Sequence, residues 1–185
     1  DFPYQEARER DITLLPLHIT FGETSYRDVL DISHREFYEK LIESDELPKT
    51  SQVPPADFEA AFRRIIEAGD TPIAVTISEK LSGTAQSAQI AAKEFPGRVF
   101  TVDSDSACIG EQVLIRYGLL LAEQGLEAAA IVKKLEEAKR EVHVIALLDT
   151  LEYLKKGGRI SAATAFAGGL LSIKPVVAVE EGEIR

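Results

Sequence analysis

The chain has 185 residues, 45% of them hydrophobic and 28% charged, so it can build the core of one globular domain or of one domain and part of another. Its formal net charge of −10 argues against nucleic acid or an anionic membrane surface as the main partner, because both favour basic patches. No apolar run approaches the roughly 20 residues that span a bilayer, so no integral membrane segment is predicted.

Cysteine use and the chain ends add two expectations. Cys108 is the only cysteine, which rules out an internal disulfide and favours a reducing, cytoplasmic location. The chain starts at Asp1 and contains no methionine, and it stops at Arg185 soon after a strand that has no visible partner, so we expect a sequence truncated at both ends rather than a complete translation product.

Hydrophobic periodicity, capping residues and turn residues predict a regular alternation of strands and helices. In chain order, the predicted elements are a short helix over 2–10, a strand over 12–21 blemished by Pro16, helices over 33–44 and 55–68, a strand over 71–77, a helix over 85–94, a strand over 98–102, helices over 110–124 and 126–140, a strand over 142–148, a short helix over 151–156, an apolar helical piece over 162–171 and a strand over 175–179.

This order is typical of an α/β protein with a mainly parallel, doubly wound sheet. The unbroken apolar strand over 142–148 is expected to be buried on both faces. Polar clusters follow three strands, at 76–84, 103–106 and 149–150, and we expect all three at the carboxyl edge of one sheet.

The stretch 76–84 is the strongest candidate for a binding site. A strand that turns directly into a helix leaves amide N–H groups without partners, and these groups with the helix dipole favour an anion. Ser82, Gly83 and Thr84 stand at this junction. The alternative is that Ser82 only caps the helix.

A second candidate is the loop over 47–55, which has prolines on both sides. Prolines lower the entropy of the free loop, so the loop can present Thr50, Ser51 and Gln52 in fixed positions. A plain linker with Ser/Thr turn chemistry is the alternative. His18 is read as a structural histidine, because no second ligand stands at metal-binding spacing.

Several motifs occur together in an order that matches a known family. They are Lys49-Thr50-Ser51-Gln52, Ile77-Ser78, Leu81-Ser82-Gly83-Thr84, Gln86-Ser87-Ala88, Val102-Asp103-Ser104, the run from Asp149 to Ser161 with its Gly157-Gly158-Arg159-Ile160-Ser161 segment, and Ile173-Lys174-Pro175. With these motifs the chain resembles the DegV family, which includes the fatty-acid-binding subunits of bacterial fatty acid kinase.

The resemblance implies a two-domain α/β protein, with residues 1–156 in the N-terminal domain and 157–185 at the beginning of a second, lipid-binding domain. It also implies that a first strand precedes Asp1 and that the rest of the second domain follows Arg185. A long-chain fatty acid would be bound with its carboxylate on Thr50 and Ser82, with Ser51, Gly83, Thr84 and Arg159 as possible secondary contacts.

The resemblance further implies a carrier rather than an enzyme. A separate ATP-dependent kinase subunit would phosphorylate the presented carboxylate, so no catalytic residue, cofactor or metal is expected in this chain. The acyl chain would lie in an apolar tunnel. Residues 162–171 could wall part of that tunnel or could be ordinary interdomain core.

Three other functions remain open from the residues themselves. An enzyme could use Ser82 or Cys108 as nucleophile, although Ser82 lacks a G-x-S-x-G frame. A binding protein or enzyme could take a small phosphorylated ligand at the helix N-terminus that Ser82, Gly83 and Thr84 begin. A DNA-binding regulator is disfavoured by the acidic balance.

Overall fold

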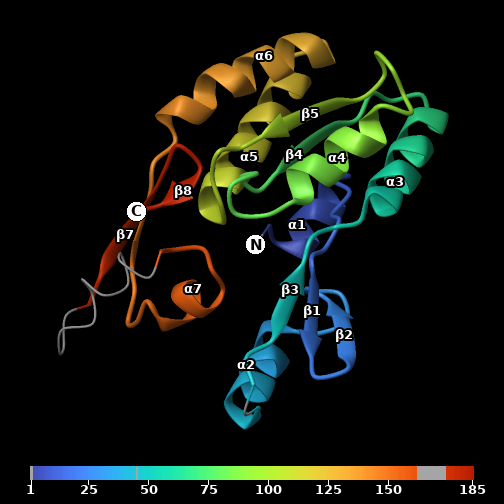
Figure 1. Cartoon of the computed structure of the whole chain (residues 1–185). Helices are drawn as coiled ribbons and strands as arrows, with labels where there is room; N and C mark the ends of the chain where they lie inside the picture. Colours follow the sequence, from blue (N-terminus) through green and yellow to red (C-terminus); the bar gives the residue numbers. More distant parts are fainter. Residues whose placement is uncertain (1, 45, 162–173) are drawn as a thin grey trace.

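The computed structural model describes residues 2–44, 46–161 and 174–185 (Figure 1). Its elements are α1 (Tyr4–Glu9), β1 (His18–Phe21), β2 (Thr24–Arg27), α2 (His34–Glu43), β3 (Lys49–Ser51), α3 (Pro55–Glu67), β4 (Ile73–Thr76), α4 (Thr84–Ala92), β5 (Phe100–Asp103), α5 (Ile109–Glu123), α6 (Ala128–Ala138), the 3-10 turn η1 (Lys139–Glu141), β6 (Val144–Leu147), α7 (Glu152–Lys156), β7 (Val176–Glu180) and β8 (Glu183–Ile184). The predicted apolar helical piece over 162–171 lies outside the described residues.

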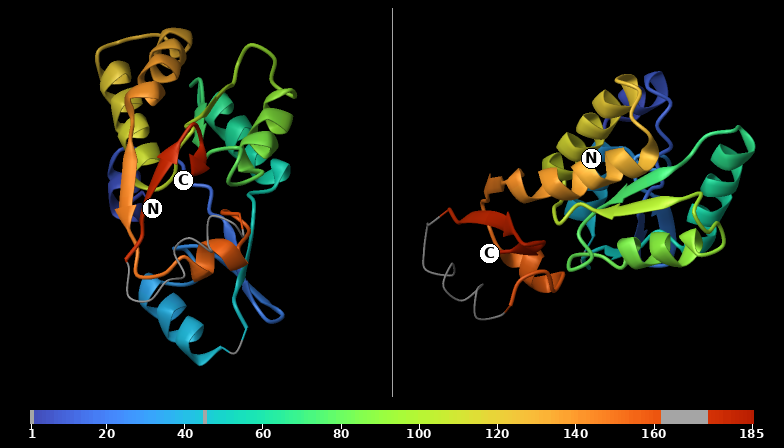
Figure 2. Two further views of the ribbon diagram at one scale, coloured as in Figure 1. Left: turned by 60° about the vertical axis from the view of Figure 1, so that its left-hand side comes forward. Right: turned by 90° about the horizontal axis from the view of Figure 1, so that it is seen from above.

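A parallel pair of strands forms the middle of the main body. Strand β4 pairs with β5 from Ile73↔Phe100 to Thr76↔Asp103. Helices α3 and α4 lie on one side of this pair, and α5 and α6 lie on the other (Figure 2). The α/β class with a parallel sheet between helices is therefore confirmed.

Side chains alternate between the two layers as a strand period of two requires. Ala74 packs against the cluster that Val53, α3 and α4 form around Phe58 and Phe62. Ile73 and Val75 face the opposite cluster, which Leu114 of α5, Leu135 of α6 and Val102 of β5 build. Each helical layer thus covers one face of the parallel pair.

The other described strands pair antiparallel. Strand β1 lies between β2 and β3, and β7 lies between β6 and β8. The strand predicted over 12–21 forms only from His18 onward, after Pro16, because proline cannot donate to a ladder. Parallel pairing is therefore confined, among the described strands, to β4 and β5.

The strand predicted over 142–148 is present as β6, but the prediction that it is buried on both faces of the parallel sheet is wrong. It pairs with β7, not with β4 or β5, and Ile145 and Leu147 are 71% and 66% exposed. An apolar run indicates that a strand is stabilised by burial, but it does not show which element of the protein buries it. Asp149 and Thr150 therefore follow a different sheet from the other two polar clusters.

The predicted division at residues 156 and 157 stays a prediction. Strand β6 precedes that point and β7 follows it, and both belong to one sheet, with α7 beside it (Figure 1). The helix predicted over 33–44 is present as α2 and begins with a capping box, in which Ser33 accepts from the Glu36 N–H and the Glu36 carboxylate accepts from the Ser33 N–H. No helix in the described ranges has the length and apolarity that a bilayer crossing needs.

Candidate functional site

The loops after β4 and β5 meet at one edge of the parallel pair. The Ser78 N–H donates to the Ser106 carbonyl at 2.8 Å, and the Ser104 N–H donates to the Thr76 carbonyl at 3.1 Å. Ser78, Ser104 and Ser106 are buried. Two of the three predicted polar clusters, 76–84 and 103–106, therefore come together as expected of parallel strands.

Asp103 ties the two loops to each other. Its carboxylate accepts from the Asp105 N–H at 3.1 Å and from the Glu79 N–H at 3.2 Å. Burial raises the pKa of Asp103, while these two donors oppose that rise. This carboxylate is thus occupied in holding backbone and contributes to the shape of the site.

The turn before Ser82 is fixed by Ser78. The Ser78 carbonyl accepts from the N–H groups of Leu81 and Ser82, both at 3.0 Å. The Ser78 hydroxyl accepts from the Lys80 N–H and donates to the carbonyl of Gly182, in the turn between β7 and β8, at 2.7 Å. A residue 104 positions away thus closes one side of the turn.

Ser82 stands just ahead of α4. Its Oγ lies 2.9 Å from the Thr84 Oγ1 and accepts from the Thr84 N–H at 3.3 Å. Gly83 occupies the N-cap position, so Ser82 takes over part of the capping role that the alternative assigns to it. Ser82 is half-buried, and its hydroxyl lies at the positive end of the helix dipole.

Arg159 reaches this turn from the segment after α7. Its Nε donates to the Leu81 carbonyl at 3.1 Å, and its Nη1 donates to the Gly157 carbonyl. These bonds hold a guanidinium group beside the residue that precedes Ser82. A permanent positive charge therefore lies next to the α4 N-terminus.

The prediction of a loop over 47–55 is wrong at its centre, because Thr50 and Ser51 lie in strand β3, where Thr50 pairs with Ile19 and Ser51 pairs with His18. The side chains of Thr50 and Ser51 are exposed. The segment from Thr50 to Val53 is called the Thr50 loop below. The chain then continues to Gln52, whose Nε2 donates to the Ser87 Oγ of α4 at 2.8 Å. This contact tethers the Thr50 loop to the helix that Ser82 precedes.

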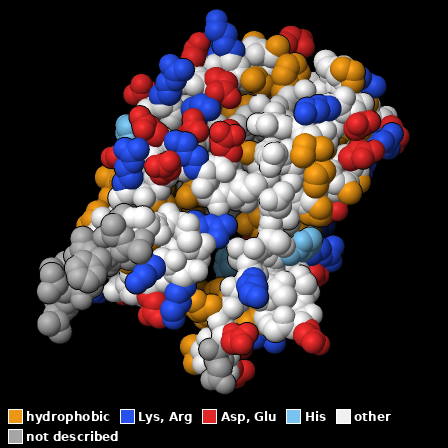
Figure 3. All heavy atoms as spheres, in the orientation of Figure 1, with side chains coloured by type: hydrophobic (Ala, Val, Ile, Leu, Met, Phe, Trp, Pro, Cys, Tyr) orange, Lys and Arg blue, Asp and Glu red, His pale blue; other side chains and the backbone are white. Residues whose placement is uncertain are grey.

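The structure thus brings Ser82, Gly83, Thr84 and Arg159 into one neighbourhood and fastens the Thr50 loop to it. Figure 3 shows a hollow between the main body and the lobe of β1, β2, β3 and α2, with Lys and Arg side chains at its margin. Gln52 was predicted to be presented by this loop together with Thr50 and Ser51, but its hydrogen bond to Ser87 of α4 was not anticipated.

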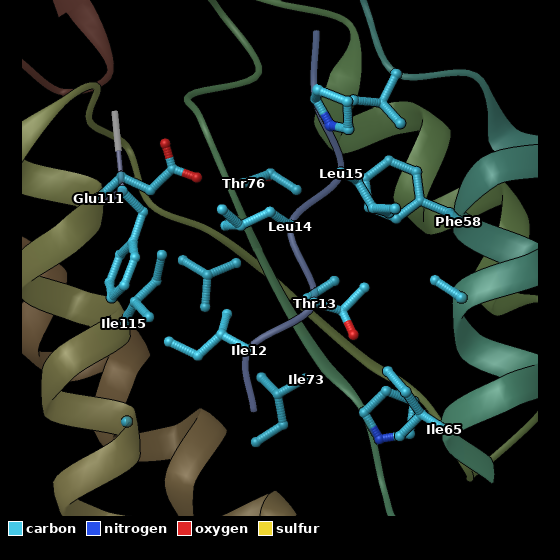
Figure 4. A pocket seen from close by; sticks show the side chains of 18 of the residues that line it. Ile12, Thr13, Leu14, Leu15, Phe58, Ile65, Ile73, Thr76, Glu111 and Ile115 are labelled. Carbon is cyan, nitrogen blue, oxygen red and sulfur yellow. The ribbon is translucent and has the colours of Figure 1, made fainter. Parts of the chain in front are cut away.

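A separate cavity of about 840 Å³ lies between β4, α3, α5 and the extended segment over 12–17. Ile12, Leu14, Ile73 and Ile115 are among its apolar walls (Figure 4). Thr50, Ser82 and Arg159 are not among its lining residues, whereas Val53 and Thr84 are. The cavity adjoins the candidate site but is not the same space.

Two polar groups of this cavity were not anticipated from the sequence. Glu111 points from α5 towards Thr76 and the cavity (Figure 4), and burial raises the pKa of its carboxyl group to about 7. The buried Thr76 Oγ1 has no hydrogen-bond partner among the described residues.

The structure gives no support to the alternative in which Cys108 acts as a nucleophile, or to a metal site. Desolvation raises the pKa of the Cys108 thiol, which opposes formation of the reactive thiolate. Within the described residues, no group of three His, Cys, Asp or Glu side chains is placed to hold a metal ion.

Comparison with known proteins gives consistent matches. A family model described as an uncharacterised protein of the DegV family matches residues 1–185. A DegV domain-containing protein of Deinococcus radiodurans is 35% identical over 173 residues, which make up 94% of this chain and 62% of that protein.

Solved structures agree in fold. A fatty-acid-binding DegV family protein from Thermus thermophilus superposes with a TM-score of 0.91 at 38% identity, over 100% of this chain and 66% of that one. A stearic-acid-binding protein from Eubacterium ventriosum gives a TM-score of 0.90 at 30% identity, over 100% of this chain and 65% of that one. The chain thus spans slightly less than two thirds of the length of these relatives.

Proposed function

Because the chain belongs to the DegV family, we propose that it binds one long-chain fatty acid, with the carboxylate on Thr50 and Ser82 and the acyl chain in an apolar tunnel. Ser51, Gly83, Thr84 and Arg159 are proposed as secondary contacts of the head group. The observation that carries the proposal is the α4 N-terminus, where Ser82, the Thr84 amide and Arg159 converge beside the tethered Thr50 loop.

The head-group chemistry suits a carboxylate. A carboxylate taken out of water must be hydrogen-bonded, or its pKa rises until it is neutral. Hydroxyl donors from Thr50 and Ser82 supply charge-assisted bonds of roughly 1.5–3 kcal/mol each, and a nearby guanidinium favours the ionised form. The relatives from Thermus thermophilus and Eubacterium ventriosum are themselves fatty-acid-binding proteins, which supports the same ligand here.

The acyl chain of the fatty acid needs an apolar surface to bind, and one face of the sheet of β6 and β7 offers such a surface. Ile145, Leu147 and Val176 are 71%, 66% and 64% exposed. Leu147 pairs with Val176, and Ile145 lies two residues from Leu147, so all three stand on one face. Each buried CH₂ of an acyl chain contributes about 0.8 kcal/mol, so a tunnel walled by this face supplies most of the affinity.

Direct identification of the bound ligand tests the proposal. Lipid extracted from the purified full-length protein and examined by mass spectrometry is expected to contain a long-chain fatty acid. Recovery of a sugar phosphate, or of no lipid, would overturn it. A phosphorylated ligand would favour the alternative site at the N-terminus of α4.

Titration of site variants tests the two proposed head-group residues. Ser82→Ala and Thr50→Ala are each expected to raise the Kd for a fatty acid by about tenfold or more, since each removes a charge-assisted bond. Thr24→Ala is the matched control, because Thr24 is an exposed threonine in β2 of the same sheet. A variant that binds as tightly as the parent would remove its residue from the head-group site.

The second part of the proposal is presentation to a separate ATP-dependent kinase subunit, in the cytoplasm and without catalysis by this chain. Thr50, Ser51 and Arg159 are exposed in the described chain, which leaves a bound carboxylate open to another protein. Arg159→Ala is expected to slow acyl phosphate formation more than it weakens lipid binding. An unchanged rate with the kinase subunit would exclude this role for Arg159.

A further inference from the structure

Gln52 makes the one described side-chain hydrogen bond between the segment of Thr50 and helix α4. Its Nε2 donates to the Ser87 Oγ at 2.8 Å, and Ser87 is completely buried. The other end of the same amide lies against Gly83. A Cβ atom built on Gly83 would stand 1.9 Å from the Gln52 Oε1 and 2.8 Å from its Cδ.

The backbone of Gly83 does not itself require glycine. Its φ of −69° and ψ of 5° are accessible to any L-residue. What a side chain would meet here is the Gln52 amide, because that amide fills the space over the Gly83 Cα. Glycine at position 83 is therefore explained by the close approach of the Gln52 amide and not by a backbone conformation that only glycine adopts.

The position of the Gln52 amide between Gly83 and Ser87, called the seat below, links the segment of Thr50 to the segment of Ser82. Thr50 precedes Gln52 by two residues, so in an extended chain their side chains share a face and their Cα atoms lie about 7 Å apart. Gly83 directly follows Ser82. The residue after Gln52, Val53, is buried in the cluster around Phe58. The loop is thus held at two successive residues, by the burial of Val53 and by the hydrogen bond of Gln52 to Ser87.

We infer that Gln52 is a positioning residue of the carboxylate site: its amide, seated between Gly83 and Ser87, sets the separation of the Thr50 and Ser82 hydroxyls. The inference rests on the proposed function and goes beyond it, because Gln52 and Gly83 act as one unit. Gln52 itself need not touch the ligand. Loss of the seat misaligns the two hydroxyls while the acyl tunnel stays intact.

A double-mutant cycle on the full-length protein tests this inference. The variants are Gln52→Ala, Gly83→Ala and the double variant, each titrated with a long-chain fatty acid and with the fatty alcohol of the same length. Each single variant is expected to raise the Kd for the acid by about tenfold and to change the Kd for the alcohol less than about twofold, because only the acid needs two aligned hydroxyls. The double variant is expected to match a single variant.

The same cycle in thermal unfolding provides a second readout. Gly83→Ala is expected to lower the Tm in the parent, where the new Cβ meets the Gln52 amide, and to leave the Tm unchanged or raised in the Gln52→Ala background, where that space is free. Gln89→Ala is the matched control, because Gln89 is an exposed glutamine on the same helix.

Different outcomes overturn different claims. A parent protein that binds neither acid nor alcohol removes the proposed function and this inference with it. Equal losses for acid and alcohol would make Gln52 a structural contact only. Multiplied losses in the double variant would show that Gln52 and Gly83 act independently, which contradicts the shared seat.

Discussion

Glu111 carries a carboxyl group whose charge state depends on the fold. Burial raises its pKa from 4.5 to about 7. Below pH 4.5 the group is protonated in both states, so it costs no stability. Between pH 4.5 and 7 the unfolded chain ionises while the folded chain does not, so stability falls as the pH rises and the loss is complete above pH 7.

Glu111→Gln is therefore expected to raise the free energy of unfolding by roughly 1–3 kcal/mol at pH 8 and to change it little at pH 4. Urea titrations at both pH values measure the difference. Glu94→Gln, at an exposed glutamate after α4, is the matched control. Equal effects at the two pH values would show that Glu111 ionises normally in the folded protein.

Among single residues, the side chains that lie in a local motif were predictable from the sequence. Ser82, Gly83 and Thr84 follow a strand and begin a helix, and about ten consecutive residues are enough to recognise this junction. Gln52 and Glu111 matter through contacts that the fold creates. The partner of Gln52 is 35 residues away, and Glu111 gains its raised pKa from burial by distant segments.

Among the elements, the pair β6 and β7 leads to a separate prediction. Its exposed face carries Ile145, Leu147 and Val176. A charge placed on an acyl tunnel wall loses its hydration when lipid binds. Leu147→Asp is therefore expected to raise the Kd for a long-chain fatty acid by at least about tenfold, as isothermal titration would measure.

Ile42→Asp is the control for this substitution, because Ile42 is an 84% exposed residue of α2. It is expected to leave lipid binding unchanged. Normal lipid binding by Leu147→Asp would place the tunnel elsewhere.

Helices were easier to predict than strand partners. The helix over 55–68 follows from Phe58, Phe62 and Ile66 at helical spacing, and the capping box at Ser33 begins α2 where expected. Strand β6 was predicted as an element, but its neighbour is set by a segment some 30 residues later. Pairing depends on tertiary contacts that no local pattern encodes.

Across the whole molecule, the parallel pair has an edge on β4 that no other described strand covers. Strand β4 pairs with β5 on one side, and its other side faces the cavity shared with residues 12–17. An unpaired strand edge is a template for another strand. The expectation that a first strand precedes Asp1 stays a prediction, and this edge offers a position for such a strand.

The chain of residues 1–185 is therefore expected to self-associate as its concentration rises. Size-exclusion chromatography with light scattering over a range of concentrations measures this. A strictly monomeric chain would show that the β4 edge is closed by its own surroundings. Many of the helices and strands were predictable in their order at this scale, but β2, β3 and β8 were not predicted as strands. The division into separate sheets was not predictable either, because it depends on pairing between distant segments, such as the return of β7 to β6.

The bond between the Ser78 hydroxyl and the Gly182 carbonyl also has a consequence in time. Its two residues are 104 positions apart. A ribosome adds roughly 5–20 residues per second, so about 5–20 s pass between the synthesis of the two partners. During that interval the β4–α4 turn is held from one side only. The turn between β7 and β8 would thus complete the loop that carries Ser82, so the proposed head-group site can be finished only after Gly182 has been synthesised.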